Sequence, residues 1–392
     1  MKNRIFLIFA LCLLFCSCEK DRDKEYDRVF ILYSIRRNTL NWDLMEDIND
    51  MCDVQNGAYV PYYNSHQAMV VIGHFKVPEA PFLLNIYRDR NGDVIRDTTF
   101  YEDSKAKLTD PQVMRKILLQ VQEKFPSHHY GMILSSHGSG WIPAGKYNTP
   151  TRKELAVRSF GQEVETTGST EMDITMLPHG IPFRLDYMMF DACLMGNIES
   201  IYELKGLADH IGASATEELT DGFDYLKIGN RLLSASPSPL DVCKDYIARY
   251  KARTGDSCSA CICLVQTSEL GNLASLCREL FAKYREKIDT VNPDKVQRFF
   301  RPDGNSDHNW FFDMEDIARQ AGMDSNDLEK LSKAIGRCVI YKDNTKAFMP
   351  GDKGFTFEYF CGLGMYLQNC GLKEFDSFYM GLQWNKDTGY VK

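Results

Sequence analysis

Several signals that would narrow the function of this 392-residue chain are missing from its sequence. It contains no internal repeat and no low-complexity tract, which excludes a solenoid and argues against disorder. With a formal net charge of −8 it has no concentrated basic face, so we exclude a nucleic-acid-binding function. No CxxC pair is matched by a second one at zinc-site spacing, and no acidic segment has the ligand order of an EF-hand. We therefore assign no metal site.

An apolar run near the start, residues 5–15, is too short for a convincing membrane-spanning helix. It follows residues 1–4, which include Lys2 and Arg4, and a positively charged start before a short apolar run is typical of an export signal. The end of the run, 13–18, resembles a bacterial lipobox, in which Cys18 becomes the lipidated first residue of the mature protein. The polar segment 19–25 would then be a solvated tether. An ordinary signal peptide cut nearby is the alternative, and both interpretations export the protein.

Thirteen cysteines in an exported chain would ordinarily indicate disulfides. Three of them fall within the first 18 residues and would be removed or lipidated. Cys258, Cys261 and Cys263 share one strand-like run, on which alternation cannot place all three side chains on the same face. We expect most of the remaining cysteines to be small, buried, apolar side chains.

Strand and helix signals alternate along residues 28–236, which favours an α/β fold with a mostly parallel sheet covered on both faces. The expected strands are 29–33, 82–87, 94–100, 131–135 and 185–190. The expected helices are 42–51, 111–125 and 197–206, followed by 241–250, 268–288 and 324–338. We expect residues 237–392 to complete the sheet and to add helices to it.

Two apolar runs each end just before a reactive side chain. The run 130–135 is followed by His137, and the run 187–190 is followed by Asp191 and Cys193. Buried parallel strands are continuous apolar runs, and such sheets carry their sites at the carboxyl ends of the strands. A thiol reacts as its thiolate, which a nearby imidazole or a helix amino terminus favours. The pattern therefore predicts a cysteine-histidine catalytic dyad.

Each member of this pair also has a structural interpretation, because free cysteines and lone histidines in apolar surroundings are usually core residues. Their equivalent positions after two strands favour catalysis for His137 and Cys193. Gly138 and Gly140 let the backbone approach a substrate closely. We expect the amides of Gly138 and Cys193 to form an oxyanion hole.

The two motifs, His137-Gly-Ser-Gly-Trp141 and Asp191-Ala-Cys-Leu-Met-Gly196, resemble those of the clostripain-like cysteine peptidases, which have a caspase-like fold. His137 and Cys193 are 56 positions apart, close to the roughly fifty that separate the two groups in caspases. The similarity covers most of the mature chain through further segments: 29–40, 108–111, 217–225 and 362–366. Two departures are visible, since Ser139 replaces a usual glycine and Ser34–Arg37 replaces a usual small and acidic stretch.

The resemblance implies a role for the carboxylate that precedes the cysteine. In such enzymes the matching Asp binds a Lys or Arg side chain of the substrate, so we expect Asp191 in the pocket, with Glu217 and Asp221 as weaker candidates. We also expect strand alternation to turn Asp191 and Cys193 toward the same side. The alternative is that Asp191 merely caps the helix starting near Asn197. No organic cofactor is expected, although some relatives use calcium.

The connection 142–182 between the two motifs is too long for an ordinary loop in a compact domain. It contains the candidate cleavage points Lys146, Arg152, Lys153 and Arg158. The resemblance implies activation by cleavage in this region, and self-processing is therefore a hypothesis. A flexible surface loop is the alternative.

We therefore expect a signal peptide at 1–17, a lipidated tether at 18–27, a caspase-like three-layer α/β/α core at 28–236 and a C-terminal part at 237–392. The resemblance implies a monomeric, membrane-anchored cysteine endopeptidase of the bacterial cell envelope that cuts protein or peptide substrates after Arg or Lys. A surface binding or scaffold lipoprotein on the same fold is the first alternative. A protease with acidic specificity is the second, for which Asp191 would be a poor pocket floor.

Overall fold

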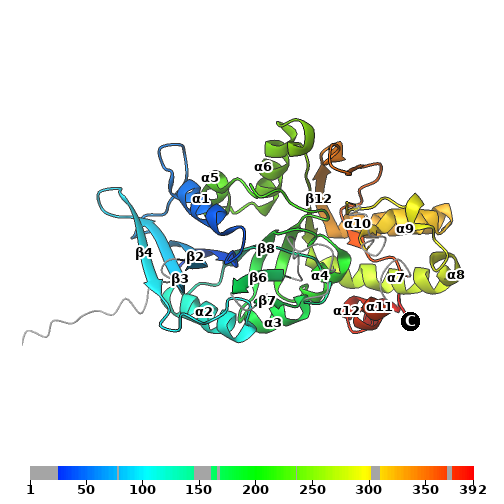
Figure 1. Ribbon diagram of the computed structural model, residues 1–392, viewed down its shortest axis with the longest axis horizontal. Helices are drawn as coiled ribbons and strands as arrows, with labels where there is room; N and C mark the ends of the chain where they lie inside the picture. Colours follow the sequence, from blue (N-terminus) through cyan, green and yellow to red (C-terminus); the bar gives the residue numbers. More distant parts are fainter. Residues whose placement is uncertain are drawn as a thin grey trace, which may run out of the picture.

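The computed structural model describes residues 25–76, 79–144, 160–165, 168–234, 236–301, 310–368 and 373–392. Within these ranges a nine-stranded sheet crosses the molecule in the order β12-β10-β9-β8-β5-β1-β2-β3-β4 (Figure 1). Its strands are β1 (Arg28–Ser34), β2 (Gln67–Lys76), β3 (Glu79–Arg88), β4 (Val94–Phe100), β5 (Tyr130–Ser135), β8 (Leu185–Asp191), β9 (Ala208–Ala213), β10 (Cys261–Gln266) and β12 (Val339–Asn344).

The middle of the sheet is parallel and its margins are antiparallel. β9, β8, β5, β1 and β2 are parallel to one another, each pairing with the next in that order. β3 and β4 on one margin, and β10 and β12 on the other, pair antiparallel. Every residue of β5 is buried, as expected for a strand covered on both faces. The predicted fold class, an α/β protein with a large and mostly parallel central sheet, is confirmed.

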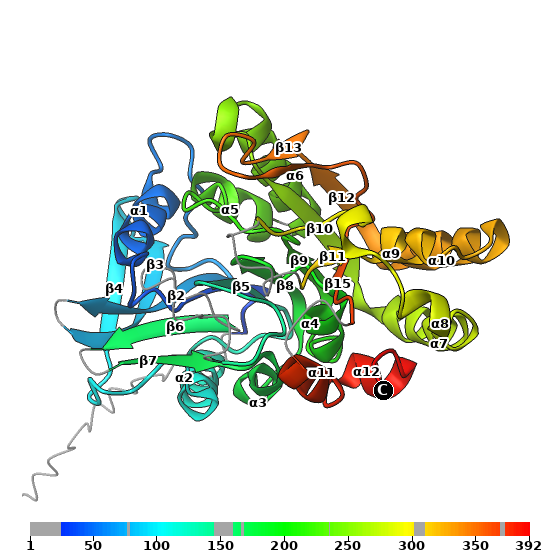
Figure 2. The same cartoon turned by 45° about the vertical axis from the view of Figure 1, so that its right-hand side comes forward.

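Helices cover both faces of the sheet (Figures 1 and 2). Those on one face share a core with Phe30 and Leu32; they are α1 (Asn41–Cys52), α5 (Tyr225–Leu232) and α6 (Pro239–Lys251). Those on the other face share a core with Val29 and Ile31; they include α2 (Pro111–Lys124), α3 (Leu177–Gly180), α4 (Ile198–Glu203), α7 (Leu270–Lys283) and α10 (Ser325–Cys338). Successive residues of β1 thus face opposite layers, which gives the three-layer arrangement.

The remaining elements lie around this framework. Figure 2 shows α8 (Arg285–Ile288) and α9 (Met314–Gln320) on the same side of the molecule as α7 and α10, and α11 (Lys373–Tyr379) and α12 (Gln383–Thr388) below α4. Short strands pair as β6 (Phe160–Glu165) with β7 (Gly168–Met172), β11 (Phe312–Asp313) with β15 (Gly364–Met365), and β13 (Ala347–Phe348) with β14 (Phe355–Thr356). In the part of the chain that the structure describes, no helix has the length and apolarity needed to span a membrane.

Most predicted elements are found within a few residues of their expected bounds. α2 begins at residue 111 as expected, and Asp110 caps it, because its carboxylate accepts a hydrogen bond from the Gln112 amide at 2.8 Å. Three differences stand out. β2, β9 and β12 were not anticipated, the connection 142–182 contains the β6–β7 hairpin, and Trp42, the first residue of the expected helix 42–51, is 78% exposed. Trp42 lies in the first turn of α1, and the buried face begins at Leu44.

The pairing of β5 with β8 depends on close contact between Gly131 and Tyr187, which are register partners. A Cβ atom at Gly131 would lie 1.9 Å from Cζ of Tyr187. We predict that Gly131→Ala lowers the free energy of unfolding by about 1–3 kcal/mol through overpacking, measured by urea denaturation. Gly206→Ala is the matched control, since open space surrounds that position, and it should change stability by less than about 0.5 kcal/mol. Equal effects from the two substitutions would contradict this account of the strand pairing.

Candidate active site

The two catalytic candidates follow neighbouring parallel strands at equivalent positions. β5 and β8 pair with Ser135 opposite Asp191, and both strands end there. His137 and Cys193 each lie two positions further on, so their separation along the chain equals the register offset of the strands. The loops touch, because a Cβ atom at Gly138 would lie 2.5 Å from the carbonyl oxygen of Cys193. The sheet therefore brings both segments to the same edge.

A tight turn follows Cys193. Leu194 has a φ of 60°, in the left-handed region that non-glycine residues rarely occupy. Its amide donates to the Thr216 carbonyl at 2.8 Å, and its carbonyl accepts from the Asn197 side chain at 2.7 Å. The Asn197 side chain also accepts from the Ser200 amide and so caps α4. These bonds hold a turn that presents Cys193 at the strand end.

His137 is half-buried and lies beside the loop that joins β1 to α1. Its Nε2 atom is 3.1 Å from the hydroxyl of Thr39. Its backbone carbonyl accepts a hydrogen bond from the amide of Gly161 at 3.0 Å. Gly161 belongs to β6, so the connection between the two motifs is attached directly to the histidine loop.

The thiol of Cys193 is held by the loop that follows β9. Sγ accepts a hydrogen bond from the amide of Glu218 at 3.2 Å. The pKa of this thiol is raised to about 12, chiefly by burial and next by the Glu217 carboxylate. The Glu218 amide opposes this increase, while the carboxylates of Glu218 and Asp191 add to it. The thiol is therefore protonated at neutral pH in this conformation.

The prediction that local groups favour the thiolate is wrong for this state. α4 spans only Ile198–Glu203, so its amino terminus has a small dipole, and it ends before the predicted Gly206. Burial and the neighbouring carboxylates outweigh the Glu218 amide. In this conformation the protonated thiol is therefore the favoured form.

Asp191 is buried and already has partners within the chain. Its Oδ2 atom accepts from Nη2 of Arg36 at 2.8 Å and from the Tyr225 hydroxyl at 2.7 Å. The alternative role as a helix cap is not observed, because Asn197 caps α4. The expectation that Asp191 and Cys193 face the same side is also wrong. β8 ends at Asp191, so alternation stops there, and Cys193 packs against the core of the opposite layer.

The other two predicted pocket carboxylates are paired in the same way. Glu217 forms an ion pair with Nε of Arg301 at 2.6 Å, and Asp221 pairs with Arg253. Arginines of this chain thus contact all three carboxylates that were expected to meet a basic substrate. The surroundings of Cys193 are less acidic than the sequence suggests.

Two residues of this region were missed by sequence reasoning. Arg36 lies in the stretch Ser34–Arg37, which departs from the family pattern. No pattern in the sequence indicates that Arg36 contacts Asp191, which is 155 positions away. No sequence pattern distinguished Glu218 from Glu217, which precedes it. Its two carboxyl oxygens are buried and accept no hydrogen bond from a donor group in the described residues.

The remaining predictions concern lipidation, processing, metal binding and the other cysteines. Cys18, Lys146, Arg152, Lys153 and Arg158 lie outside the described residues. Across the ranges that the structure covers, no group of three or more His, Cys, Asp or Glu side chains is placed to hold a metal ion. The prediction that most cysteines are small buried side chains is confirmed by six of them: Cys243, Cys261, Cys263, Cys277, Cys338 and Cys361.

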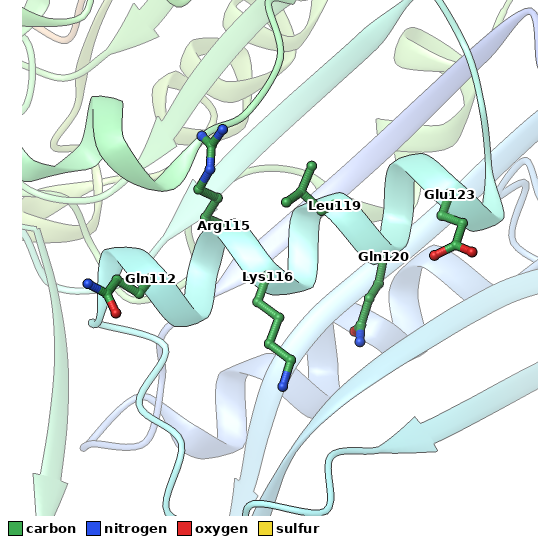
Figure 3. A pocket seen from close by; sticks show the side chains of 6 residues that line it. All are labelled: Gln112, Arg115, Lys116, Leu119, Gln120 and Glu123. Atoms are coloured by element: carbon green, nitrogen blue, oxygen red, sulfur yellow. The ribbon is translucent and has the colours of Figure 1, made fainter.

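A hollow of about 470 Å³ lies elsewhere, on the outer face of α2 (Figure 3). Its lining comes from that helix alone: Gln112, Arg115, Lys116, Leu119, Gln120 and Glu123. Such a surface is one side of an amphipathic helix, whose opposite side buries Met114 and Ile117. It is separate from the ends of β5 and β8.

A three-layer α/β/α fold with His and Cys after adjacent parallel strands defines the caspase-like class of cysteine peptidases. The clostripain family matches residues 33–387, and the chain belongs to that family. Over 146 residues it is 27% identical to clostripain of Hathewaya histolytica, a match covering 35% of this chain and 26% of clostripain. The chain thus spans about a quarter of that curated relative.

Solved structures share the fold. An inactive zymogen of a C11 protease from Parabacteroides distasonis aligns with a TM-score of 0.78 at 20% identity, covering 93% of this chain and 98% of that one. A secreted C11 cysteine protease from Bacteroides thetaiotaomicron aligns with a TM-score of 0.77 at 23% identity, covering 93% and 99%. A secreted C11 cysteine protease from B. thetaiotaomicron in complex with an irreversible peptide inhibitor gives a TM-score of 0.77 at 21% identity, again covering 93% and 99%.

The electrostatic setting of Cys193 predicts its reactivity. Because the pKa is about 12, alkylation of Cys193 by iodoacetamide should rise about tenfold per pH unit between pH 7 and 9, without a plateau. Glu217→Gln removes the largest charge effect, so it should lower the pKa and speed alkylation several-fold at pH 8. Peptide mapping by mass spectrometry measures the rate at this one cysteine. Glu123→Gln, on the exposed face of α2, is the control, and equal rates for both variants would contradict the assignment.

Proposed function

We propose that this protein is a cysteine endopeptidase that cleaves after Arg or Lys, with Cys193 as nucleophile and His137 as general base and acid. The observation that carries the proposal is the equivalent placement of the two residues after β5 and β8. Membership of the clostripain family supports it independently.

The proposed reaction uses groups of this chain only. His137 takes the proton of the Cys193 thiol as sulfur attacks the scissile carbonyl carbon. The amides of Gly138 and Cys193 stabilise the negative oxygen of the tetrahedral intermediate. His137 then gives the proton to the departing amine as the carbon–nitrogen bond breaks. Water, deprotonated by His137, finally hydrolyses the thioester and frees the carboxylate product.

A preference for basic side chains is supported by the carboxylates that act on the thiol. Glu217, Glu218 and Asp191 all raise its pKa, so these three carboxyl groups lie near the place where a scissile bond would sit. A substrate cation would interact favourably with these carboxyl groups, even though Asp191 and Glu217 already pair with arginines of the chain. Acidic substrates would be repelled by them.

We further propose that the chain is made as a latent precursor that processes itself in the connection 142–182. A protonated thiol fits a latent state. The hairpin at the end of the connection bonds to the catalytic loops, since Gly161 donates to His137 and Gln162 donates to the Ser136 hydroxyl at 3.2 Å. Cutting the chain before β6 would free this hairpin to shift, and with it the histidine loop.

The location of the protein is also a proposal. The basic and apolar start followed by Cys18 supports export and anchoring by lipid to the bacterial cell envelope. Substrates would then be proteins or peptides outside the cytoplasm.

Matched fluorogenic peptides ending in Arg, Lys or Asp test the proposed activity. The processed protein should cleave the Arg and Lys peptides. Cys193→Ala should lower kcat/KM by at least about a thousandfold, and His137→Ala by about a hundredfold or more, because each removes a reacting group. Cleavage of none of the peptides would instead favour a binding or scaffold lipoprotein. Cleavage of the Asp peptide alone would overturn the assignment of the pocket.

Mass spectrometry of the purified protein tests self-processing. The parent chain should yield two fragments whose new ends lie after Lys146, Arg152, Lys153 or Arg158, whereas Cys193→Ala should remain intact. Adding a trace of the active parent to intact Cys193→Ala separates cleavage within one molecule from cleavage between molecules. An intact parent that still cleaves peptides would show that no processing is needed.

A further inference from the structure

Arg36 occupies the centre of a buried charge network next to the catalytic strands. Its side chain is only 3% exposed. Nε donates to the Ser135 hydroxyl at 2.8 Å, Nη1 pairs with Asp47 at 2.7 Å, and Nη2 pairs with Asp191 at 2.8 Å. The same loop carries Thr39, which contacts His137. A permanent positive charge therefore lies beneath the site.

In this arrangement one carboxylate oxygen of Asp191 is already engaged in hydrogen bonds within the chain. Oδ2 accepts hydrogen bonds from Arg36 and from Tyr225, and the Ser135 hydroxyl lies 3.3 Å away. The backbone of Gly222 lies against Oδ1. A substrate guanidinium binds a carboxylate most strongly with two parallel hydrogen bonds, one to each oxygen. Asp191 cannot offer that geometry while Arg36 is in place, and the charge of Arg36 also weakens its pull on any cation.

Glu218 is the carboxyl group left to receive a substrate cation. Its oxygens are buried and accept no hydrogen bond from a donor group of the described part of the chain. The side chain within reach is the Asp191 carboxyl, with which Glu218 can share a proton. Its backbone holds the Cys193 sulfur, so it lies beside the reacting atom. Burial and the adjacent Asp191 raise the pKa of this carboxyl well above its usual range, which keeps it neutral until a cation arrives.

We propose that Arg36 and Glu218 determine specificity, so that the site prefers Lys to Arg immediately before the cut bond, with Glu218 pairing with the lysine ammonium. This inference rests on the proposed peptidase function. An ammonium is a compact point charge that one carboxylate oxygen can bind, whereas a guanidinium loses more when two-pronged binding is blocked. Arg36 thus lowers the affinity for arginine more than that for lysine.

The test compares kcat/KM for three peptides that differ only in the residue before the cut: Lys, Arg or uncharged norleucine. The parent should prefer Lys to Arg. Arg36→Met combined with Asp47→Asn, which leaves Asp191 as the one carboxylate that loses Arg36, should raise the Arg-to-Lys ratio about tenfold or more. Glu218→Gln should lower the Lys-to-norleucine ratio by a similar factor. Arg231→Ala, which breaks a pair with Asp245 between α5 and α6, is the matched control and should leave both ratios unchanged.

These ratios do not depend on how much of a variant folds, because misfolded molecules lower the rates for all three peptides alike. Altered ratios in both site variants, with the control unchanged, support the proposal. Turnover with unaltered ratios, or a parent that prefers Arg, overturns it while the peptidase function stands. If the parent cleaves none of the three peptides, so that its rates equal those of Cys193→Ala, the peptidase function and this inference are both overturned.

Discussion

The parallel pairing of β5 with β8 is the constraint on which the site depends. It fixes Ser135 opposite Asp191, and everything beyond the strand ends follows from that register. A slip of one residue would turn the side chains of a buried strand to the other layer. The cores on the two faces prevent this, because Met188 and Phe190 fill one layer while Tyr187 and Met189 fill the other. The hydrophobic core therefore positions the polar chemistry.

A second constraint is electrostatic. Carboxylates from β8 and from the loop after β9 gather near Cys193, and burial makes uncompensated charge costly there. Arg36 offsets part of this charge by joining Asp47 of α1 to Asp191 of β8, and Arg301 does the same for Glu217. Removing one partner of such a buried pair typically costs about 3–5 kcal/mol. The pairs therefore tie the loops around the site to the sheet, and they also decide which charges remain for a substrate.

Local sequence patterns predicted many of the helices and strands of this fold. Contacts between residues far apart in the chain could not be predicted from such patterns. β1, β5 and β8 are continuous apolar runs, and Asp110-Pro111 is a strong helix start, so these elements were found. The hairpin of β6 and β7 was missed because its two short strands are mostly polar and show no apolar run. The positions of His137 and Cys193 followed from strand ends. The pairing of Arg36 with Asp191 did not, because no local pattern links a residue of the loop after β1 to a residue of β8 that is 155 positions away. The raised pKa of Cys193 likewise depends on side chains that only the fold brings together.

The most direct test is a crystal structure of the processed protein after reaction with an irreversible peptidyl inhibitor that carries a basic residue next to its warhead. The account predicts a covalent bond from Sγ of Cys193 to the inhibitor, with the His137 imidazole across the bound peptide and within about 4 Å of the sulfur or the leaving-group position. An inhibitor attached to another residue would contradict it. So would an imidazole directed into a different part of the molecule, out of reach of the bound peptide.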